Sequence, residues 1–479
     1  MENLKEKTTK GLFWSMMNSG TIQLLNVVIG ILLGRLLSPA DFGIVGVLTI
    51  FTVIAGNLQS SGFSQGLINM KAPTHRDYNS VFWFNILASF AIYIVLFAAA
   101  PLIAWFFKEP RLVSLSRFIF LGFVISSFGI AQGAYMTKNL MIRELTVSTI
   151  AALLISGTVG VVLAYKGFTY WSLAWQQILF ISVLNIGRYY YTGWRPTWKI
   201  DFGPIRGMFS FSVKILFTNI INTVSNHILT VVFGRLFPLK DVGNYTQANN
   251  WNTKANSFIS GTMSQVAQPV LVAVADERER EKRIMRKMMR FTAFISFPCM
   301  FGLALVSREF IVLALTERWL ESALLLKILC ISGAFMPFYT MYQNLVISSG
   351  RSDWYLYCNI AQIVLQLTII LLFHRLGMVP MIIAYSAFLI VWLLAWQHIA
   401  NRLLGITLME TLRDICPFML AAALVMVVTH FCTMAISNLW LLLAARFVMA
   451  AMLYFMVMKL FRAKILDECL QFLLGKLKK

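Results

Sequence analysis

The side chains best suited to chemistry in this chain are charged or amide groups inside long apolar segments. Lys254 lies near the middle of one such segment, in the run QANNWNTKANSF, close to Asn249 and Asn250. A lysine offers a compact positive charge with three hydrogen-bond donors, which suits an anionic group such as a phosphate. The alternative is a lysine that snorkels out of its apolar surroundings or joins an internal hydrogen-bond network. Because its central position makes snorkelling hard, we expect Lys254 to line a polar cavity.

Three further residues place a charge or a titratable ring inside apolar segments. Lys214 lies about two turns from the end of its segment, so that an anion contact and a simple anchor are equally supported. His227 lies nearer the centre of the same segment, where it could sense pH or pack as a neutral ring between helices. Arg446 lies in the last apolar segment, where a structural or lipid-contacting role competes with ligand contact.

The first part of the chain supplies amides rather than charges at such positions. Asn18, Gln59 and Gln65 are the members of this group that we take as candidates for a cavity lining. Their donors and acceptors suit the hydroxyl groups of a sugar, but amides also hold neighbouring helices together in a membrane.

Carboxylates are absent from the middle of the apolar segments. Asp41, Asp241, Glu309, Glu317 and Glu321 all lie near segment ends or in loops. An antiporter driven by a cation or a proton usually needs a buried carboxylate, so this pattern argues against that class and leaves the energy source open. The chain also has no GxxxxGK[ST] motif and no cysteine spacing typical of a metal or redox site, so we expect no ATP hydrolysis and no cofactor.

The composition shows what solvent surrounds most of the chain. Hydrophobic residues make up 58% of the 479 residues and charged residues 13%, whereas soluble domains carry about 25% charged residues. Apolar runs of roughly 20 to 30 residues recur along the chain, and about 20 helical residues cross a bilayer core. We therefore expect an all-α polytopic membrane protein with about 14 transmembrane helices. The expected helices span residues 9–36, 41–68, 78–107, 112–137, 143–165, 169–191, 207–236, 242–272, 286–314, 320–348, 354–376, 379–402, 412–434 and 438–460.

The net charge of +21 is explained by membrane topology. If the N-terminus is inside, the inside segments hold most of the 41 lysines and arginines, including the run DEREREKRIMRKMMR. This asymmetry is the positive-inside pattern, and it accounts for the basic excess without a nucleic-acid partner. It places both termini of this multi-pass membrane protein in the cytoplasm. A short amphipathic tail, ILDECLQFLLGKLKK, is expected to lie on the membrane surface.

An internal repeat organises the helices. The turn GRLLSPADFG, which begins at Gly34, recurs as GRLFPLKDVG from Gly234, and Ser64-Gln65 recurs as Ser264-Gln265 in the same register. Chance similarity of two tight turns is the alternative, but the shared register favours duplication. An offset of six helices is even, so both copies have the same orientation, as in transporters built from parallel repeats. The expected divisions are an N-lobe (1–191), a cytoplasmic linker (192–206), a C-lobe (207–404), and two extra helices with the tail (405–479).

The opening KTTKGLFWS, the turn GRLLSPADFGIVG and this plan of two six-helix lobes plus two helices resemble the Wzx-type polysaccharide exporters. These flippases belong to the multidrug/oligosaccharidyl-lipid/polysaccharide superfamily, and the resemblance is strongest to the colanic acid/teichuronic acid exporter branch. It covers essentially the whole chain. It implies transport of an undecaprenyl-pyrophosphate-linked oligosaccharide from the inner to the outer leaflet of a bacterial inner membrane, by alternating access. Lys254 would then contact the pyrophosphate.

Three alternatives to this interpretation remain open. A drug/cation antiporter of the same fold is disfavoured by the missing carboxylates. A membrane polysaccharide polymerase or ligase would need a catalytic outer loop, and the expected outer loops are short. A scaffold for the polysaccharide polymerase and export machinery would not need Lys254. The expected protein is not an enzyme, acts as a monomer among membrane lipids, and has no sequence feature that identifies its glycan.

Overall fold

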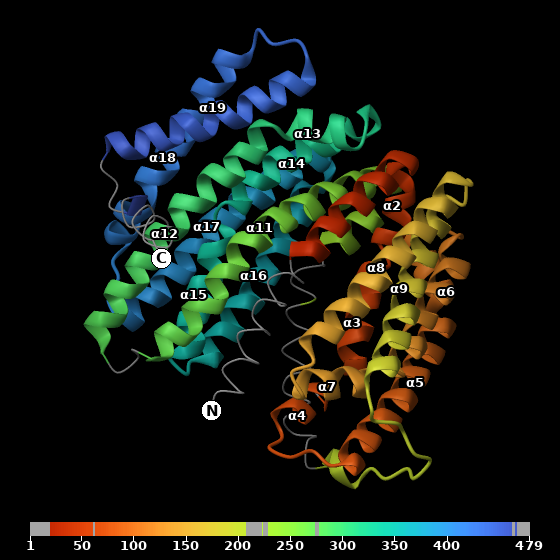
Figure 1. The fold of residues 1–479 in the computed structure, drawn as a ribbon. Coiled ribbons are helices and arrows are strands. Elements are labelled where there is room, and N and C mark those ends of the chain that lie inside the picture. The colour runs from red at the N-terminus through yellow and green to blue at the C-terminus, as the bar shows by residue number, and fades with distance from the viewer. Residues whose placement is uncertain are drawn as a thin grey trace. The chain divides into compact units, whose positions relative to one another are not determined.

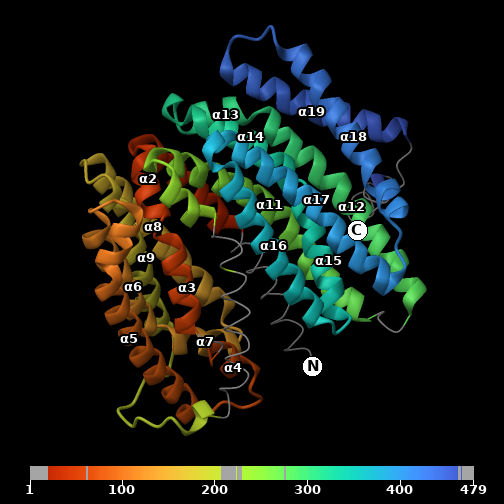
Figure 2. The same ribbon diagram turned by 180° about the vertical axis from the view of Figure 1, so that it is seen from behind.

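The protein is described by a computed structural model, which covers residues 20–60, 63–206, 223, 229–273, 277–461 and 465–466. Within these residues every regular element is a helix and no strand is present. Contacts divide the chain into two compact units, Met1–Gly243 and Asn244–Lys479. Figures 1 and 2 show the helices of each unit from opposite sides. The all-α membrane fold expected from the sequence is therefore confirmed.

The first unit is a bundle in which long helices pack side by side. A helix over Gly20–Leu36 precedes the labelled elements. The labelled helices are α2 (Pro39–Gly46), α3 (Thr49–Ser60), α4 (Phe63–Asn69), α5 (His75–Phe107), α6 (Leu112–Ser127), α7 (Ile130–Lys138), α8 (Ile142–Tyr165) and α9 (Tyr170–Tyr191). In Figure 1, α5, α6, α8 and α9 run alongside one another. The unit ends at Gly243, in the first turns of the long helix that begins at Leu239.

The second unit contains most of one long polar helix and the helices that follow it. They are α11 (Leu239–Ala273), α12 (Arg278–Leu305), α13 (Ser307–Ala314), η1 (Glu317–Trp319), α14 (Leu320–Gly333), α15 (Met336–Ser348), α16 (Ser352–Phe373), η2 (His374–Leu376), α17 (Met378–Leu404), α18 (Leu408–Thr433) and α19 (Leu439–Leu460). Here α18 and α19 lie together against α12 and α13, as both views show.

Helical residues are present in every predicted range, although most of the range 207–236 lies outside the described residues and only 223 and 229–236 are described there. Four predicted helices are interrupted, over 41–68, 112–137, 286–314 and 320–348. Hydropathy does not register these interruptions because the residues at the breaks are themselves apolar or small. The break before α15 has a clear local cause, since a proline in the first turn of a helix favours a new start there.

The number of membrane spans stays a prediction. Nine of the described helices are long and apolar enough to cross a membrane, and the bent pair α6–α7 would add a tenth. Helix α11 is long enough, since its 35 residues extend about 52 Å, but it is too polar to qualify by composition. A helix of that composition can cross lipid only if part of its surface is kept away from the hydrocarbon.

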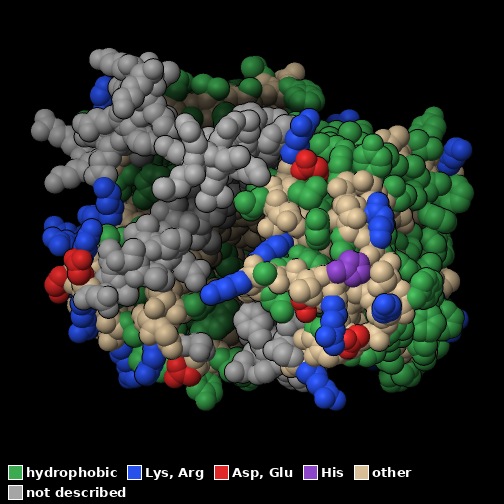
Figure 3. Space-filling model, turned by 60° about the horizontal axis from the view of Figure 1, so that its bottom comes forward, with side chains coloured by type: hydrophobic (Ala, Val, Ile, Leu, Met, Phe, Trp, Pro, Cys, Tyr) green, Lys and Arg blue, Asp and Glu red, His purple; other side chains and the backbone are tan. Residues whose placement is uncertain are grey.

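The outer surface of the described helices matches lipid rather than water. Large apolar side chains are exposed along the long helices, such as Trp105 at 76% and Phe447 at 72%. Figure 3 shows hydrophobic side chains covering the right side of the view, while many lysine and arginine side chains lie on the face turned toward the viewer. The protein is thus a multi-pass membrane protein.

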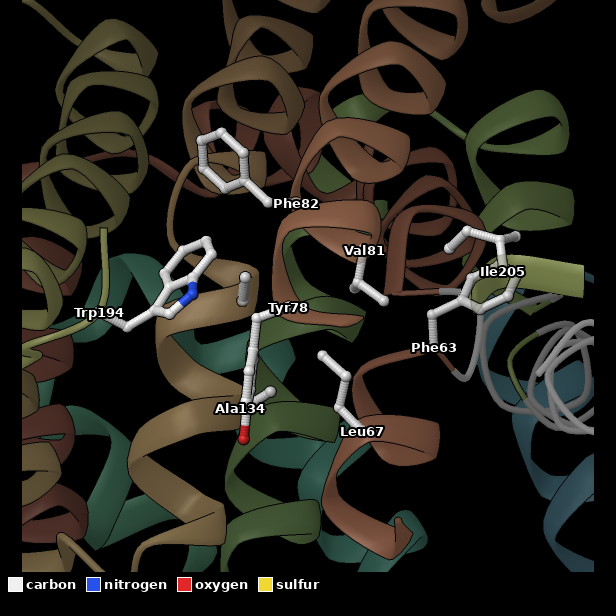
Figure 4. Close-up of a cluster of buried hydrophobic side chains, with 9 residues drawn as sticks. Phe63, Leu67, Tyr78, Val81, Phe82, Ala134, Trp194 and Ile205 are labelled. Atoms are coloured by element: carbon white, nitrogen blue, oxygen red, sulfur yellow. The ribbon is translucent and has the colours of Figure 1, made fainter. Parts of the chain in front are cut away.

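The linker predicted at residues 192–206 is irregular up to a helical turn at 203–206, and it packs against the start of α5. The Asn79 side chain donates to the Lys199 carbonyl at 2.7 Å and accepts from the Thr197 amide at 2.8 Å. Trp194 is buried in the apolar cluster drawn in Figure 4, which joins α4, α5, α7 and the linker. The Asp201 carboxylate accepts from the Gly203 amide and pairs with Arg76, and both interactions lower its pKa. The linker is therefore fastened to the first unit along its length.

Within the first unit, the two copies of the repeated turn touch each other reciprocally. A Cβ atom added at Gly43 would overlap the carbonyl oxygen of Leu239, and one added at Gly243 would overlap the carbonyl oxygen of Pro39. The two contacts are equivalent under the 200-residue offset of the repeat, since Gly43 corresponds to Gly243 and Pro39 corresponds to Leu239. Reciprocal contacts of this kind arise where two equivalent segments meet about a two-fold axis. The contact supports the parallel repeat inferred from the sequence.

Serine and threonine residues set the starts of the helices at this turn and elsewhere. The Ser38 hydroxyl accepts from the Asp41 amide at 3.3 Å, and the Asp41 carboxylate accepts from the Ser38 amide at 2.9 Å. The same reciprocal cap is formed by Thr407 and Glu410 at the start of α18. Such capping boxes satisfy backbone donors that the first helical turn leaves free.

In the second unit, ion pairs fasten the last two long helices to α12 and α13. Arg286 on α12 pairs with Glu410 at 3.0 Å and with Asp414 at 2.7 Å on α18. Deeper in the unit, Arg446 on α19 pairs with Glu309 on α13 at 2.8 Å, and the two side chains are only 8% and 4% exposed. The appended helices are therefore bound to this unit by buried charge as well as by apolar packing.

These contacts correct one sequence expectation. Glu309 does lie near the start of its helix, and Asp414 lies in the second turn of α18, but both carboxylates are buried. The structural break between α12 and α13 brings Glu309 inside, where an arginine neutralises it. Buried carboxylates are therefore present, although few carboxylates stand in the apolar segments of the sequence. The absence of buried carboxylates can no longer be used as an argument against a coupled antiporter.

The reciprocal glycine contact gives a first prediction. Gly43→Ala and Gly243→Ala should each destabilise the protein by about 1–3 kcal/mol, because backbone atoms cannot move aside as a side chain can. Both variants should show similarly lowered melting temperatures in detergent. Gly56→Ala is the control, since an added Cβ there meets nothing within 4 Å. A wild-type melting temperature for either crossing variant would contradict the contact.

The buried ion pair gives a second prediction. Glu309→Ala or Arg446→Ala should each cost about 3–5 kcal/mol, because either change leaves an unpaired buried charge. The double variant Glu309→Ala/Arg446→Ala should lose less than the two single losses added together, as measured by thermal unfolding. Glu277→Ala is the control, since its pair with Arg280 is exposed on both sides and should be worth less than about 1 kcal/mol. Additive losses would show that Glu309 and Arg446 do not interact energetically.

Candidate functional site

Helix α11 carries its polar residues on two different faces. Asn250, Thr253 and Ser257 are exposed and Lys254 is half-buried, and their spacing of three and four residues places them on one side of the helix. Lys254 stands near the middle of the 35 residues of this helix. An exposed polar face in the middle of a membrane helix is stable only beside water or a polar ligand. This face is the centre of the candidate site.

The charge of Lys254 is not neutralised within the described part of the chain. Its Nζ atom lies 4.6 Å from the centroid of the Trp251 ring, a cation–π contact. None of the described carboxylates forms an ion pair with it. The aromatic ring holds the ammonium group in place without cancelling its charge, so the group can attract an anion.

The opposite face of α11 serves packing. The Asn256 side chain donates to the Gly333 carbonyl of α14 at 2.9 Å and accepts from the Ser260 hydroxyl at 3.0 Å. Asn252 is buried directly against Gly333, because a Cβ atom added at Gly333 would overlap the side-chain amide of Asn252. These asparagines hold two helices together, as amides do in membrane proteins. The polar stretch that the sequence presents as one group is therefore divided between binding and packing.

The other predicted site residues have varied settings. Asn249 is half-buried on α11, and Gln65 is exposed on α4 with its amide donating to Asn69 at 3.3 Å. Gln59 lies in α3, but its side chain is outside the described residues. Asn18, Lys214 and His227 also lie outside the described residues. Their roles stay predictions, as does that of Asn249.

Arg446 is enclosed by hydrogen-bond partners besides Glu309. Its Nη1 donates to the Leu305 carbonyl at 3.1 Å, its Nε lies 3.3 Å from the Thr433 hydroxyl, and its Nη2 lies 3.1 Å from Nδ1 of His430. Because a guanidinium can only donate, His430 must present an unprotonated Nδ1 to it. These contacts favour the structural role that competed with ligand contact for Arg446.

A large apolar cavity lies beside this arginine in the second unit. Its volume is about 950 Å³, and it is lined mainly by α12, α13 and α19, with Met426 of α18 and Ala255 of α11. The lining includes Pro298, Gly302, Phe310, Met426, Phe447 and Tyr454. A cavity of this size and chemistry fits hydrocarbon. No sequence pattern indicates this cavity, because its helices come together only in the fold.

Comparisons with known proteins identify the family of this chain. Residues 32–324 match the family described as "Polysaccharide biosynthesis protein". Teichuronic acid biosynthesis protein TuaB of Bacillus subtilis is 24% identical over 407 residues, which cover 85% of this chain and 83% of the relative. Lipopolysaccharide biosynthesis protein WzxC of Escherichia coli is 24% identical over 357 residues, covering 73% and 72%.

A solved structure extends the likeness to the whole fold. The lipid II flippase MurJ in an inward closed conformation is similar with a TM-score of 0.73 at 13% identity, covering 95% of this chain and 100% of that one. At this identity the likeness shows the fold alone. The GRLLSPADFG turn is typical of Wzx-type exporters. Because the family match spans more than half of the chain, the protein belongs to the polysaccharide biosynthesis protein family of membrane exporters.

Proposed function

We propose that this protein is a flippase that moves an undecaprenyl-pyrophosphate-linked oligosaccharide from the inner to the outer leaflet of a bacterial inner membrane. It does so by alternating access and without catalysing a reaction. The observation that carries the proposal is the exposed polar face of α11, with Lys254 unpaired by any described carboxylate. Such a face needs a polar partner, and the ammonium group selects an anionic one.

The substrate has three parts, and the second unit offers chemistry for each of them. The pyrophosphate suits Lys254, since charge-assisted hydrogen bonds to phosphate oxygens are strong. The sugar hydroxyls suit the exposed amide and hydroxyl groups of Asn250, Thr253 and Ser257. The polyprenyl tail suits the apolar cavity lined mainly by α12, α13 and α19. Each part thus has a matching surface within one unit.

The repeat supports a moving mechanism. Reciprocal packing of the two repeated turns at Gly43 and Gly243 is what two related lobes would produce, and we take residues 1–191 and 207–404 as those lobes. In this proposal both termini are cytoplasmic, and the chain acts as a monomer that delivers its glycan to the polysaccharide polymerase and export machinery. The relatives' names concern teichuronic acid and lipopolysaccharide biosynthesis, which fits a glycan cargo.

Lys254 provides the direct test of this function. Lys254→Ala should weaken the substrate contact by about 1.5–3 kcal/mol, the worth of a hydrogen bond to a charged group, which is roughly ten- to hundredfold in affinity. Export of surface glycan in a complemented exporter-deficient strain should fall accordingly, while Lys254→Arg should preserve part of it. Lys166→Ala, in the exposed loop after α8, is the control. Unchanged export in Lys254→Ala at equal protein abundance would rule out this role.

The apolar cavity allows a separate test of the tail site. Gly302→Phe should fill part of the cavity, since a Cβ added there meets only the end of Met426 at 3.6 Å. Labelling by a photoactivatable polyprenyl pyrophosphate should fall several-fold at an unchanged melting temperature. Val391→Phe places the same side chain at an exposed position of α17 and is the control. Equal labelling of all three proteins would show that the tail does not occupy this cavity.

A further inference from the structure

A break in a membrane helix of the first unit places backbone polar groups beside an arginine. Helices α6 and α7 meet at an angle of 46° between Ser127 and Ile130. The Gly129 amide donates to the Ser126 carbonyl at 3.0 Å rather than continuing the α-helical pattern to Ile125. The Ile125 carbonyl accepts instead from the Asn185 side chain of α9 at 2.5 Å. One turn along α9, the Arg188 Nη1 donates to the Gly129 carbonyl at 3.2 Å.

Gly129 and Gly133, at the start of α7, leave space for these two side chains. A Cβ atom at Gly129 would overlap the Asn185 amide and lie 3.2 Å from the Arg188 Nη1. A Cβ atom at Gly133 would lie 3.3 Å from the Arg188 Cζ. Larger residues at these two positions would push the guanidinium away from the break. The glycines therefore fix the arginine at the point where the helix is interrupted.

Arg188 differs from Arg286 and Arg446 of the second unit in having no compensating carboxylate among the described residues. Arg286 and Arg446 each pair with carboxylates, whereas none of the carboxylates in the described residues pairs with Arg188. Its Nε atom is buried and has no hydrogen-bond partner among the described residues. Leaving a cation in this state is costly unless a further anion completes it. If Arg188 had only a structural role, we would expect a carboxylate to pair with it here.

A second polar group at the break is left without well-formed hydrogen bonds among the described residues. Gln132 is fully buried, and neither atom of its amide has a hydrogen bond of good geometry there, although the Tyr189 hydroxyl of α9 lies close enough to interact with it. Tyr189 follows Arg188 in the chain, so the amide lies beside the part of α9 that carries the arginine. A buried amide without well-formed hydrogen bonds is rare in proteins, and it requires a specific explanation. A ligand that accepts a hydrogen bond would supply one.

We propose that Arg188 and Gln132, at the break between α6 and α7, form a subsite for a phosphate group. The guanidinium fork matches phosphate oxygens, and the Gln132 amide can donate a further hydrogen bond. Broken helices are where membrane transporters place their binding groups. Helix α9 leads directly into the linker predicted to be cytoplasmic, so the subsite belongs to the loading side. The proposal rests on the proposed transport of a lipid-linked pyrophosphate and adds a second contact, apart from Lys254.

The full-length protein in phosphatidylcholine nanodiscs tests this subsite, with farnesyl pyrophosphate as the probe. Arg188→Gln should weaken binding at least tenfold, Arg188→Lys should give an intermediate affinity, and Gln132→Leu should weaken it several-fold. Asn185→Ala is the matched control, because it caps the neighbouring carbonyl at the same break without carrying charge. It should lower the melting temperature and leave the affinity unchanged. If Arg188→Gln does not fold, Arg188→Lys and Gln132→Leu carry the test.

The outcomes separate this inference from the proposed function. Absence of binding to the wild-type protein would contradict recognition of a lipid pyrophosphate altogether. Binding that is lost in Lys254→Ala but kept in folded Arg188→Gln and Gln132→Leu would overturn only the subsite. Weaker binding in Arg188→Gln without a matching effect of Asn185→Ala supports it. Adding phosphatidylglycerol to the nanodiscs then distinguishes the source of the phosphate, since displacement of the probe would assign the subsite to a lipid headgroup.

Discussion

The need to compensate charge inside a lipid-surrounded protein governs this structure. Hydrocarbon offers no hydrogen bonds and little screening, so each buried ion must find a partner within the fold or from a ligand. Glu309 and Asp414 satisfy this condition through Arg446 and Arg286. Lys254 does not satisfy it with any described residue. The distinction between compensated and uncompensated charge is what separates helix packing from candidate binding in the second unit.

The same constraint explains why helix breaks are informative. A break frees backbone groups that water would satisfy in a soluble protein, so side chains must satisfy them in a membrane. Asn185 does so at the break between α6 and α7. At the break between α12 and α13, the Leu305 carbonyl accepts from Arg446. Both breaks therefore draw arginine side chains inward, but among the described residues only the second provides a carboxylate to neutralise its arginine.

The helices follow from the sequence directly, whereas contacts between side chains far apart in the chain do not. Helix lengths follow from bilayer thickness, so ranges such as 143–165 and 438–460 agree with α8 and α19 to within one residue. The repeat also followed from residue identities, and its two turns meet at Gly43 and Gly243. Breaks left no hydropathy signal. Pairing of Glu309 with Arg446 depends on positions 137 residues apart, which no local pattern reveals.

The sign of the uncompensated charge bears on the choice between a glycan flippase and a drug antiporter. A cationic drug near Lys254 would meet a like charge in surroundings that screen it poorly, whereas a pyrophosphate would be attracted. The buried carboxylates could in principle bind a cation, but Glu309 and Asp414 are already engaged by arginines. A coupling cation would first have to displace a guanidinium from its partner. The described charges therefore favour an anionic substrate over a cationic one, whatever energy source drives transport.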